Sequence, residues 1–232
     1  MTMTAAYTMT EMVGSGAYSI SEAALYARVS PEKMARWLLG TSHSRPAVKS
    51  ALELERNPEH WVTFYDLIQC LAIRDIRNRR KIPLDVIRQT IDTAEQMYGI
   101  KYPFARKHVT KLFGDQISLN IDGYGLVEAS GGHRNQFQMM PVIERYLDDL
   151  SWDGDGLAEA YTPLRYDGFS VVIDRRIQFG EPVVRPGRYT ARTLYDAYAA
   201  EGGMQEAAKA YGVQPGAIDI ARRYFDMLSL AA

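Results

Sequence analysis

A short pattern that occurs twice limits the possible folds of this chain more than any other feature. The pattern is Glu-Ala-Ala, four residues, Val, one residue and Pro, and its copies are 184 residues apart, at Glu22-Ala23-Ala24, Val29 and Pro31 and at Glu206-Ala207-Ala208, Val213 and Pro215. In each copy a small alanine lets one helix approach the next, the valine fills the angle between them, and the proline begins the second helix. The pattern predicts a helical corner near each end of the chain. Such a corner either serves only for packing or, in a helix-turn-helix protein, places its second helix in the major groove of DNA.

The predicted fold class is mainly α with small β elements. A flexible tail (1–17) precedes an N-terminal winged helix-turn-helix domain (18–113), an acidic mixed α/β connector (114–167) and a C-terminal three-helix helix-turn-helix domain (168–232). Residues 48–55 alternate in polarity and residues 60–63 can return beside them, which predicts a β-hairpin. Further helices are expected at 142–150, 191–200, 204–211 and 215–229.

Charge is distributed unevenly although the net charge is only -1. Residues 18–111 contain 16 basic and 10 acidic residues, whereas residues 115–167 contain 3 basic and 10 acidic residues. A basic module followed by an acidic connector is the asymmetry expected when one region faces phosphate. Chance imbalance on a solvated surface is the alternative.

The composition favours a cytoplasmic protein. The only cysteine is Cys70, so an internal disulfide is impossible. No apolar run approaches the roughly 18 residues of a membrane-spanning helix, and the N-terminus lacks the pattern of a secretory signal.

Catalytic motifs are not evident, and we expect neither an enzyme nor a metal or cofactor site. The four histidines are too scattered for a local metal motif. The acidic run at residues 153–156 lacks the glycine and glutamate positions of a calcium-binding loop. Cys70 lies in an apolar helical stripe, which is typical of a core residue.

The two blocks resemble known families. The N-terminal block resembles a MerR-type winged helix-turn-helix at Tyr18-Ser19-Ile20-Ser21-Glu22-Ala23-Ala24, Val29-Ser30-Pro31 and Trp37-Leu38. The C-terminal block resembles a compact antitoxin domain at Val171-Val172-Ile173-Asp174, Phe179-Gly180-Glu181-Pro182-Val183-Val184 and Gly187-Arg188. The combination is similar to VapB-type antitoxins, found beside PIN-like ribonuclease toxins. The first corner departs from the family at Arg28, where a turn glycine is usual; the second corner has Gly212.

The resemblance implies a non-enzymatic antitoxin of a type II toxin-antitoxin system that represses its own operon as a homodimer. Candidate DNA-binding residues lie in and beside both corners: Ser30, Lys33, Arg36, Arg45, Lys49, Arg56, Gln214, Arg222 and Arg223. The alternatives are a stand-alone ligand-responsive transcriptional regulator and an interaction protein that does not touch DNA.

The implied partner is a cognate PIN-like ribonuclease, whose carboxylates gather around a divalent metal. A planar guanidinium can oppose such carboxylates with paired hydrogen bonds. The C-terminal block offers Arg175, Arg176, Arg185 and Arg188 on predicted strand and turn. Two alternatives stay open. Arg188 can serve only to orient its loop, or the toxin can dock on the acidic connector around Glu144, Asp148 and Asp149.

Overall fold

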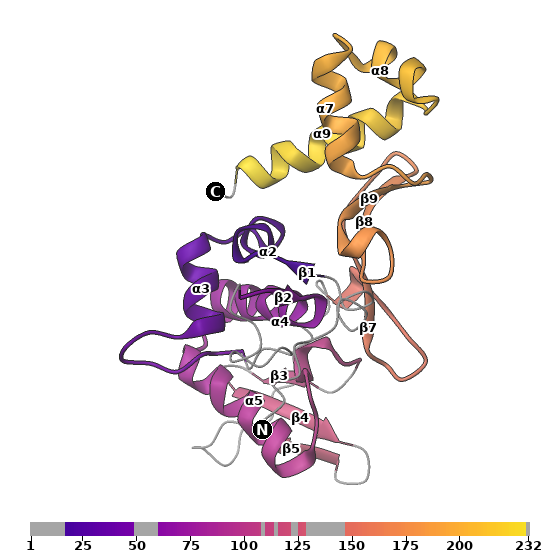
Figure 1. Cartoon of the computed structure of the whole chain (residues 1–232). Coiled ribbons are helices and arrows are strands. Elements are labelled where there is room, and N and C mark those ends of the chain that lie inside the picture. Colours follow the sequence, from indigo (N-terminus) through magenta and orange to yellow (C-terminus); the bar gives the residue numbers. More distant parts are fainter. Residues whose placement is uncertain are drawn as a thin grey trace, which may run out of the picture.

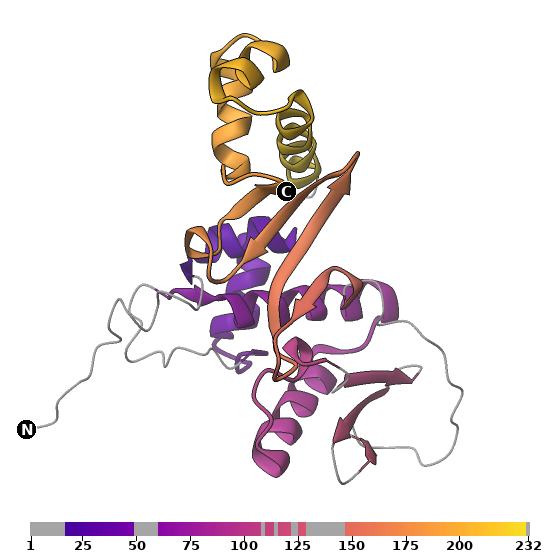
Figure 2. The same ribbon diagram turned by 90° about the vertical axis from the view of Figure 1, so that its right-hand side faces the viewer.

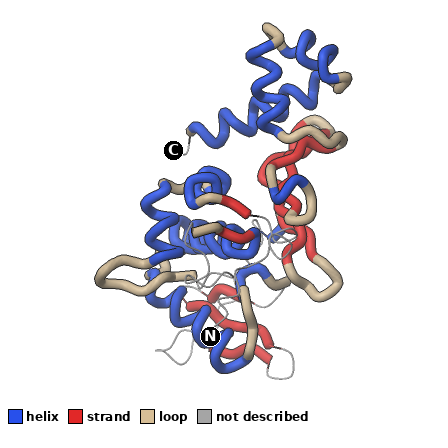
Figure 3. The backbone as a smooth tube through the Cα atoms, viewed as in Figure 1, coloured by secondary structure: helices blue, strands red, loops and turns tan. Residues whose placement is uncertain are grey.

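The computed structural model describes residues 17–48, 60–107, 110–113, 116–121, 125–128 and 147–230. Within these ranges the protein is mainly helical with small antiparallel sheets, which confirms the expected fold class. Figure 3 shows two groups of helices with strands running between them.

The first group of helices is built around the N-terminal corner. Its elements are β1 (Ala17–Tyr18), α2 (Ile20–Ala27), α3 (Pro31–Leu39), β2 (Val62–Thr63) and α4 (Phe64–Asp75). Local side-chain caps explain where its helices begin. The Ser30 hydroxyl accepts a hydrogen bond from the Lys33 amide, and Thr63 forms a capping box with Asp66. β1 pairs antiparallel with β2, which joins the starts of α2 and α4.

A second layer lies beside α4 (Figure 1). The elements that follow α4 are η2 (Ile76–Arg80, a π-helical turn), α5 (Leu84–Tyr98), η3 (Pro103–Ala105), β3 (Thr110–Phe113), β4 (Gln116–Ile121) and β5 (Gly125–Glu128). The three strands form an antiparallel sheet in the order β3-β4-β5. Gly99 ends α5 in the left-handed conformation that favours glycine.

A four-stranded antiparallel sheet links the two groups of helices. Its strands are β6 (Leu150–Trp152), β7 (Ala158–Tyr166), β8 (Phe169–Asp174) and β9 (Pro182–Arg185), in the order β6-β7-β8-β9. β7 and β8 form a hairpin in which Tyr166 pairs with Phe169 across the turn. The short helix η4 (Gln178–Gly180) connects β8 to β9.

The C-terminal helices are α7 (Ala191–Ala200), α8 (Met204–Tyr211) and α9 (Pro215–Ser229), which match the ranges predicted from sequence. Figure 2 shows this bundle above the long β7–β8 hairpin, with the first group of helices at the opposite end of the sheet. The sheet contributes to both cores. Tyr161 and Ile173 belong to the N-terminal core, whereas Val171 and Val184 belong to the C-terminal core. Burial of apolar side chains on both ends therefore holds the halves together.

The middle of the chain differs in detail from the sequence prediction. The predicted helix over residues 142–150 extends too far, because Leu150 begins β6 and packs into the core. Most of the predicted hairpin at residues 48–55 lies outside the described residues, and the described return strand β2 pairs with β1. The boundary expected between residues 167 and 168 falls at the turn of the β7–β8 hairpin.

Candidate functional site

The two helical corners share one backbone geometry. In the first, Arg28 adopts the left-handed conformation and the Val29 amide donates to the Ala24 carbonyl at 3.0 Å. In the second, Gly212 adopts the same conformation and the Val213 amide donates to the Ala208 carbonyl at 2.9 Å. The sequence echo therefore corresponds to a repeated local structure. Hydrogen bonds from the residues after a helix to its last carbonyls are the usual C-terminal cap.

The second helix of the first corner has a solvent-exposed cationic face. The opposite side of α3 packs into the core through Met34, Trp37 and Leu38. Lys33 and Arg36 are both exposed. α3 thus presents two cations on the surface of a helix whose start is held by Ser30.

Of the remaining candidates near the first corner, Arg45 lies within the described residues. Arg45 forms an ion pair with Asp92 of α5 at 2.5 Å, and its side chain is still 57% exposed. Glu32, in the first turn of α3, is also exposed and adds a negative charge there. Lys49 and Arg56 lie outside the described residues.

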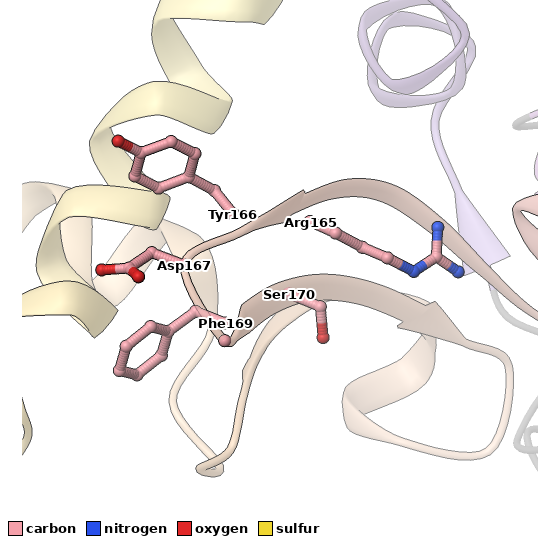
Figure 4. A pocket seen from close by; sticks show the side chains of 6 residues that line it. Arg165, Tyr166, Asp167, Phe169 and Ser170 are labelled. Atoms are coloured by element: carbon pink, nitrogen blue, oxygen red, sulfur yellow. The ribbon is translucent and has the colours of Figure 1, made fainter.

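The second helix of the second corner is covered by the tip of the β7–β8 hairpin. Phe169 lies against the start of α9 so closely that a Cβ added at Gly216 would be 2.3 Å from the ring. About two turns further along α9, the Arg223 guanidinium lies over the Tyr166 ring, 3.9 Å from its centroid. Figure 4 shows Tyr166 and Phe169 pointing toward α9, whereas Arg165 points away. The hairpin tip also lines a shallow, open hollow of about 410 Å³.

Ion pairs within α9 engage the two arginines predicted to bind DNA. Arg222 bridges Asp219 and Asp226, and Arg223 donates to Asp219 at 2.7 Å. The hydrogen bond from Arg223 lowers the pKa of Asp219. Gln214, at the start of α9, is exposed. Release of either arginine toward phosphate would break contacts inside the helix.

The hairpin tip was not among the sequence-based site residues. The signal that could have revealed it is Asp167-Gly168, because Asp-Gly between alternating runs is typical of a two-residue hairpin turn. Tyr166 and Phe169 flank that turn. Their packing on α9, 46 or more residues later in the chain, could not be predicted from local pattern.

The four arginines of the predicted toxin site have different surroundings. Arg175 lies over the Tyr65 ring and pairs with Asp153, and only 22% of its side chain is exposed. Arg176 is paired with Glu159 and Asp174. Arg185 donates to the Gly187 carbonyl at 2.9 Å. Arg188 is exposed and has no side-chain partner within the described part of the chain.

Among the described residues, no group of histidine, cysteine and carboxylate side chains is arranged to hold a metal ion. No helix in those ranges combines the length and apolar character needed to cross a membrane. Cys70 is fully buried, and burial raises the pKa of its thiol well above the usual value.

Comparison with known proteins finds distant relatives. No protein-family model matches the chain. It is 23% identical over 221 residues to a Mycobacterium tuberculosis protein named "Putative antitoxin VapB45", covering 85% of this chain and 89% of that protein. An uncharacterised protein of the same organism, Rv2308, is 23% identical over 164 residues, covering 69% of this chain and 64% of its own length, so the match spans less than two thirds of that relative.

A solved structure shares the fold. The crystal structure of Rv2018 from Mycobacterium tuberculosis aligns with a TM-score of 0.60 at 19% identity, over 88% of this chain and 96% of that one. The distant homology supports an antitoxin-type identification and suggests a role in a toxin-antitoxin system.

Proposed function

We propose that this protein is a non-enzymatic antitoxin that binds a PIN-like ribonuclease toxin and represses its own operon by binding DNA as a homodimer. The observation that carries the DNA-binding part is the exposed cationic face of α3, which follows a helical corner with a left-handed turn residue. The toxin-binding part is supported by the distant relationship to a protein named as an antitoxin and by exposed arginine in the C-terminal half. Residues 18–113 act as a winged helix-turn-helix domain and residues 168–232 as an antitoxin domain.

In this proposal the first corner reads DNA and the second does not. Lys33 and Arg36 are exposed on α3 and can approach phosphates or base edges without breaking a described side-chain contact. Arg222 and Arg223, by contrast, are held by carboxylates of their own helix. The hairpin tip also lies against α9, with Phe169 at Gly216 and Tyr166 under Arg223. A homodimer would place two copies of α3 on half-sites about one helical turn apart.

Fluorescence anisotropy with the promoter duplex of the protein's own operon tests this assignment. The double variant Lys33→Ala/Arg36→Ala should weaken binding by tenfold or more, and the slope of log affinity against log salt should fall by about 1 for each lost phosphate contact. Arg192→Ala is the matched control, because Arg192 is an exposed arginine of α7. Equal affinity of the double variant and the wild type would overturn the assignment to α3.

The toxin contact is assigned to the loop between β9 and α7. Arg188 is exposed there without a described side-chain partner, and Arg185 makes a single described hydrogen bond to a backbone carbonyl. Both can turn toward carboxylates of a partner at small cost. Arg175 and Arg176 are tied into the sheet by their own carboxylates, so they would have to break ion pairs first.

Co-expression with the neighbouring nuclease tests this contact. Arg185→Ala/Arg188→Ala should release toxicity and lower co-purification of the toxin, while Arg176→Ala should protect cells as the wild type does. Circular dichroism checks that each variant is folded. If the double variant still protects cells and retains the toxin, the arginine loop is not the contact, and the acidic connector becomes the favoured surface.

A further inference from the structure

A small hollow lies where the first corner, α4 and the linking sheet meet. Its volume is about 160 Å³, and its lining residues are Arg28, Leu71, Arg74, Asp75, Arg79, Asp149 and Tyr161. They come from the turn after α2, from the last part of α4 and η2, and from β7 with the residue before β6 (Figure 1). The hollow is therefore formed by segments far apart in the chain.

The carboxylates around this hollow are already paired. Asp75 accepts a hydrogen bond from Arg74 at 3.0 Å and lies 3.5 Å from Arg79. Arg74 also donates to the Ala27 carbonyl. Asp149 pairs with Arg165 at 2.7 Å. The acidic groups of the wall thus have basic partners, and cationic groups outnumber them.

Arg28 has no such partner. Its side chain makes no hydrogen bond or ion pair within the described part of the chain, although the residue is only partly exposed. Its backbone is left-handed, with φ of 53° and ψ of 53°. That conformation is unfavourable for an L-residue and is taken by Gly212 at the equivalent position of the second corner. An arginine at this position carries a conformational cost and has no described contact to offset it.

Tyr161 supplies a second donor without a partner. The residue is only 3% exposed, and its hydroxyl forms no hydrogen bond to any described residue. Because Tyr161 lines the hollow, its hydroxyl can donate a hydrogen bond to a polar occupant there. Both unpartnered groups can donate, and the guanidinium can only donate.

From these contacts we propose that the hollow binds a small oxyanion of the phosphate type, held by the Arg28 guanidinium and the Tyr161 hydroxyl. A tetrahedral oxyanion accepts hydrogen bonds on every oxygen, which complements a site whose free groups are donors. A planar guanidinium matches two of these oxygens at once. The volume holds one phosphate group, so any remaining part of a larger phosphate monoester would extend into solvent. Occupancy would tie the turn before α3 to β7, and the site acts independently of the proposed toxin contact.

Binding of inorganic phosphate to the full-length protein tests the proposal. Thermal unfolding and isothermal calorimetry are measured against phosphate concentration, with sodium chloride replacing phosphate at matched ionic strength. Phosphate should raise the melting temperature saturably. Two variants remove the donors with little disturbance: Arg28→Gly suits the left-handed backbone, and Tyr161→Phe deletes only the hydroxyl. Each should weaken phosphate binding by tenfold or more.

The control is Arg192→Ala, which removes an exposed arginine of α7 that does not line the hollow. It should bind phosphate as the wild type does. Adenosine monophosphate provides a second arm: equal affinity for both compounds assigns the site to the phosphate group alone, and tighter binding of the nucleotide assigns it to a phosphate monoester. The absence of saturable binding, or equal binding by both donor variants, would overturn the proposal. Neither result would bear on DNA or toxin binding, because the experiment contains neither.

Discussion

The packing of Phe169 against Gly216 makes a sharp prediction about the second corner. Gly216 lies in the first turn of α9, where Ala is ordinarily a better helix former by up to about 1 kcal/mol. A Cβ at this position would be 2.3 Å from Cε2 of Phe169 and 2.9 Å from Cδ2. The ring would have to leave α9 or the helix start would have to shift. Overpacking of this kind costs about 1–3 kcal/mol, so Gly216→Ala should lower the free energy of unfolding by about 1–2 kcal/mol.

A double-mutant cycle isolates the contact. Phe169→Ala alone loses packing of a partly buried ring and should cost about 1–2 kcal/mol. With the ring absent, Gly216→Ala should become neutral or stabilising, which gives a coupling energy of about 2 kcal/mol between the two positions. Val171→Ala provides a matched comparison, because that residue lies in the C-terminal core on the same strand as Phe169.

The assay is urea unfolding by circular dichroism, with hydrogen exchange of the α9 amides as a local measurement. Gly216→Ala should speed exchange at the start of α9 in the wild-type background and leave it unchanged beside Phe169→Ala. A stabilising effect of Gly216→Ala with Phe169 present, or a coupling energy near zero, would refute the reasoning. The hairpin tip would then not restrict the start of α9.

Three further changes probe other contacts. The hydrogen bond from Arg223 lowers the pKa of Asp219. The carboxylate therefore stabilises the fold at a pH above its unfolded-state pKa of about 3.9, and this stabilisation is lost as the pH falls through the folded-state pKa. Asp219→Asn should lose less stability than the wild type between about pH 5 and 2, and urea midpoints that fall in parallel for both proteins would contradict this. Tyr18→Phe removes a buried hydroxyl that donates to the Gly180 carbonyl at 3.0 Å and should cost about 1 kcal/mol in the same assay. Cys70, with its buried thiol of raised pKa, should react with a disulfide reagent only after unfolding, and rapid reaction in native protein would disprove its burial.

Helix positions could be predicted from sequence because their signals are local. Ser30 caps α3 through the neighbouring Lys33 amide, and Thr63 with Asp66 caps α4, so a few adjacent residues decide each start. The C-terminal helices have similar local start and stop signals, with Gly212 ending α8 and Pro215 beginning α9. Each decision depends on residues within one or two turns.

Strand pairing and contacts between the halves could not be predicted in the same way. β1 pairs with β2 across 44 residues of chain, although each strand is only two residues long. Leu150 begins a strand because β7 pairs with it and a core covers it. The Tyr18 hydroxyl meets the Gly180 carbonyl 162 residues away. These choices depend on partners that no local pattern identifies.

The candidate site shows why two similar motifs need not act alike. Both corners have the same turn geometry, and a reading of motifs alone assigns both to DNA. The difference lies in the surroundings of the second helix of each corner. Lys33 and Arg36 of α3 are exposed. On α9, Phe169 lies against Gly216, and the Asp219 carboxylate pairs with Arg222 and Arg223. A helix can enter a groove only with an uncovered face, and an arginine can neutralise phosphate only if it is not already paired. The exposure of Lys33 and Arg36 and the pairing of Arg222 and Arg223 are therefore the reason for proposing the first corner, and not the second, as the one that binds DNA.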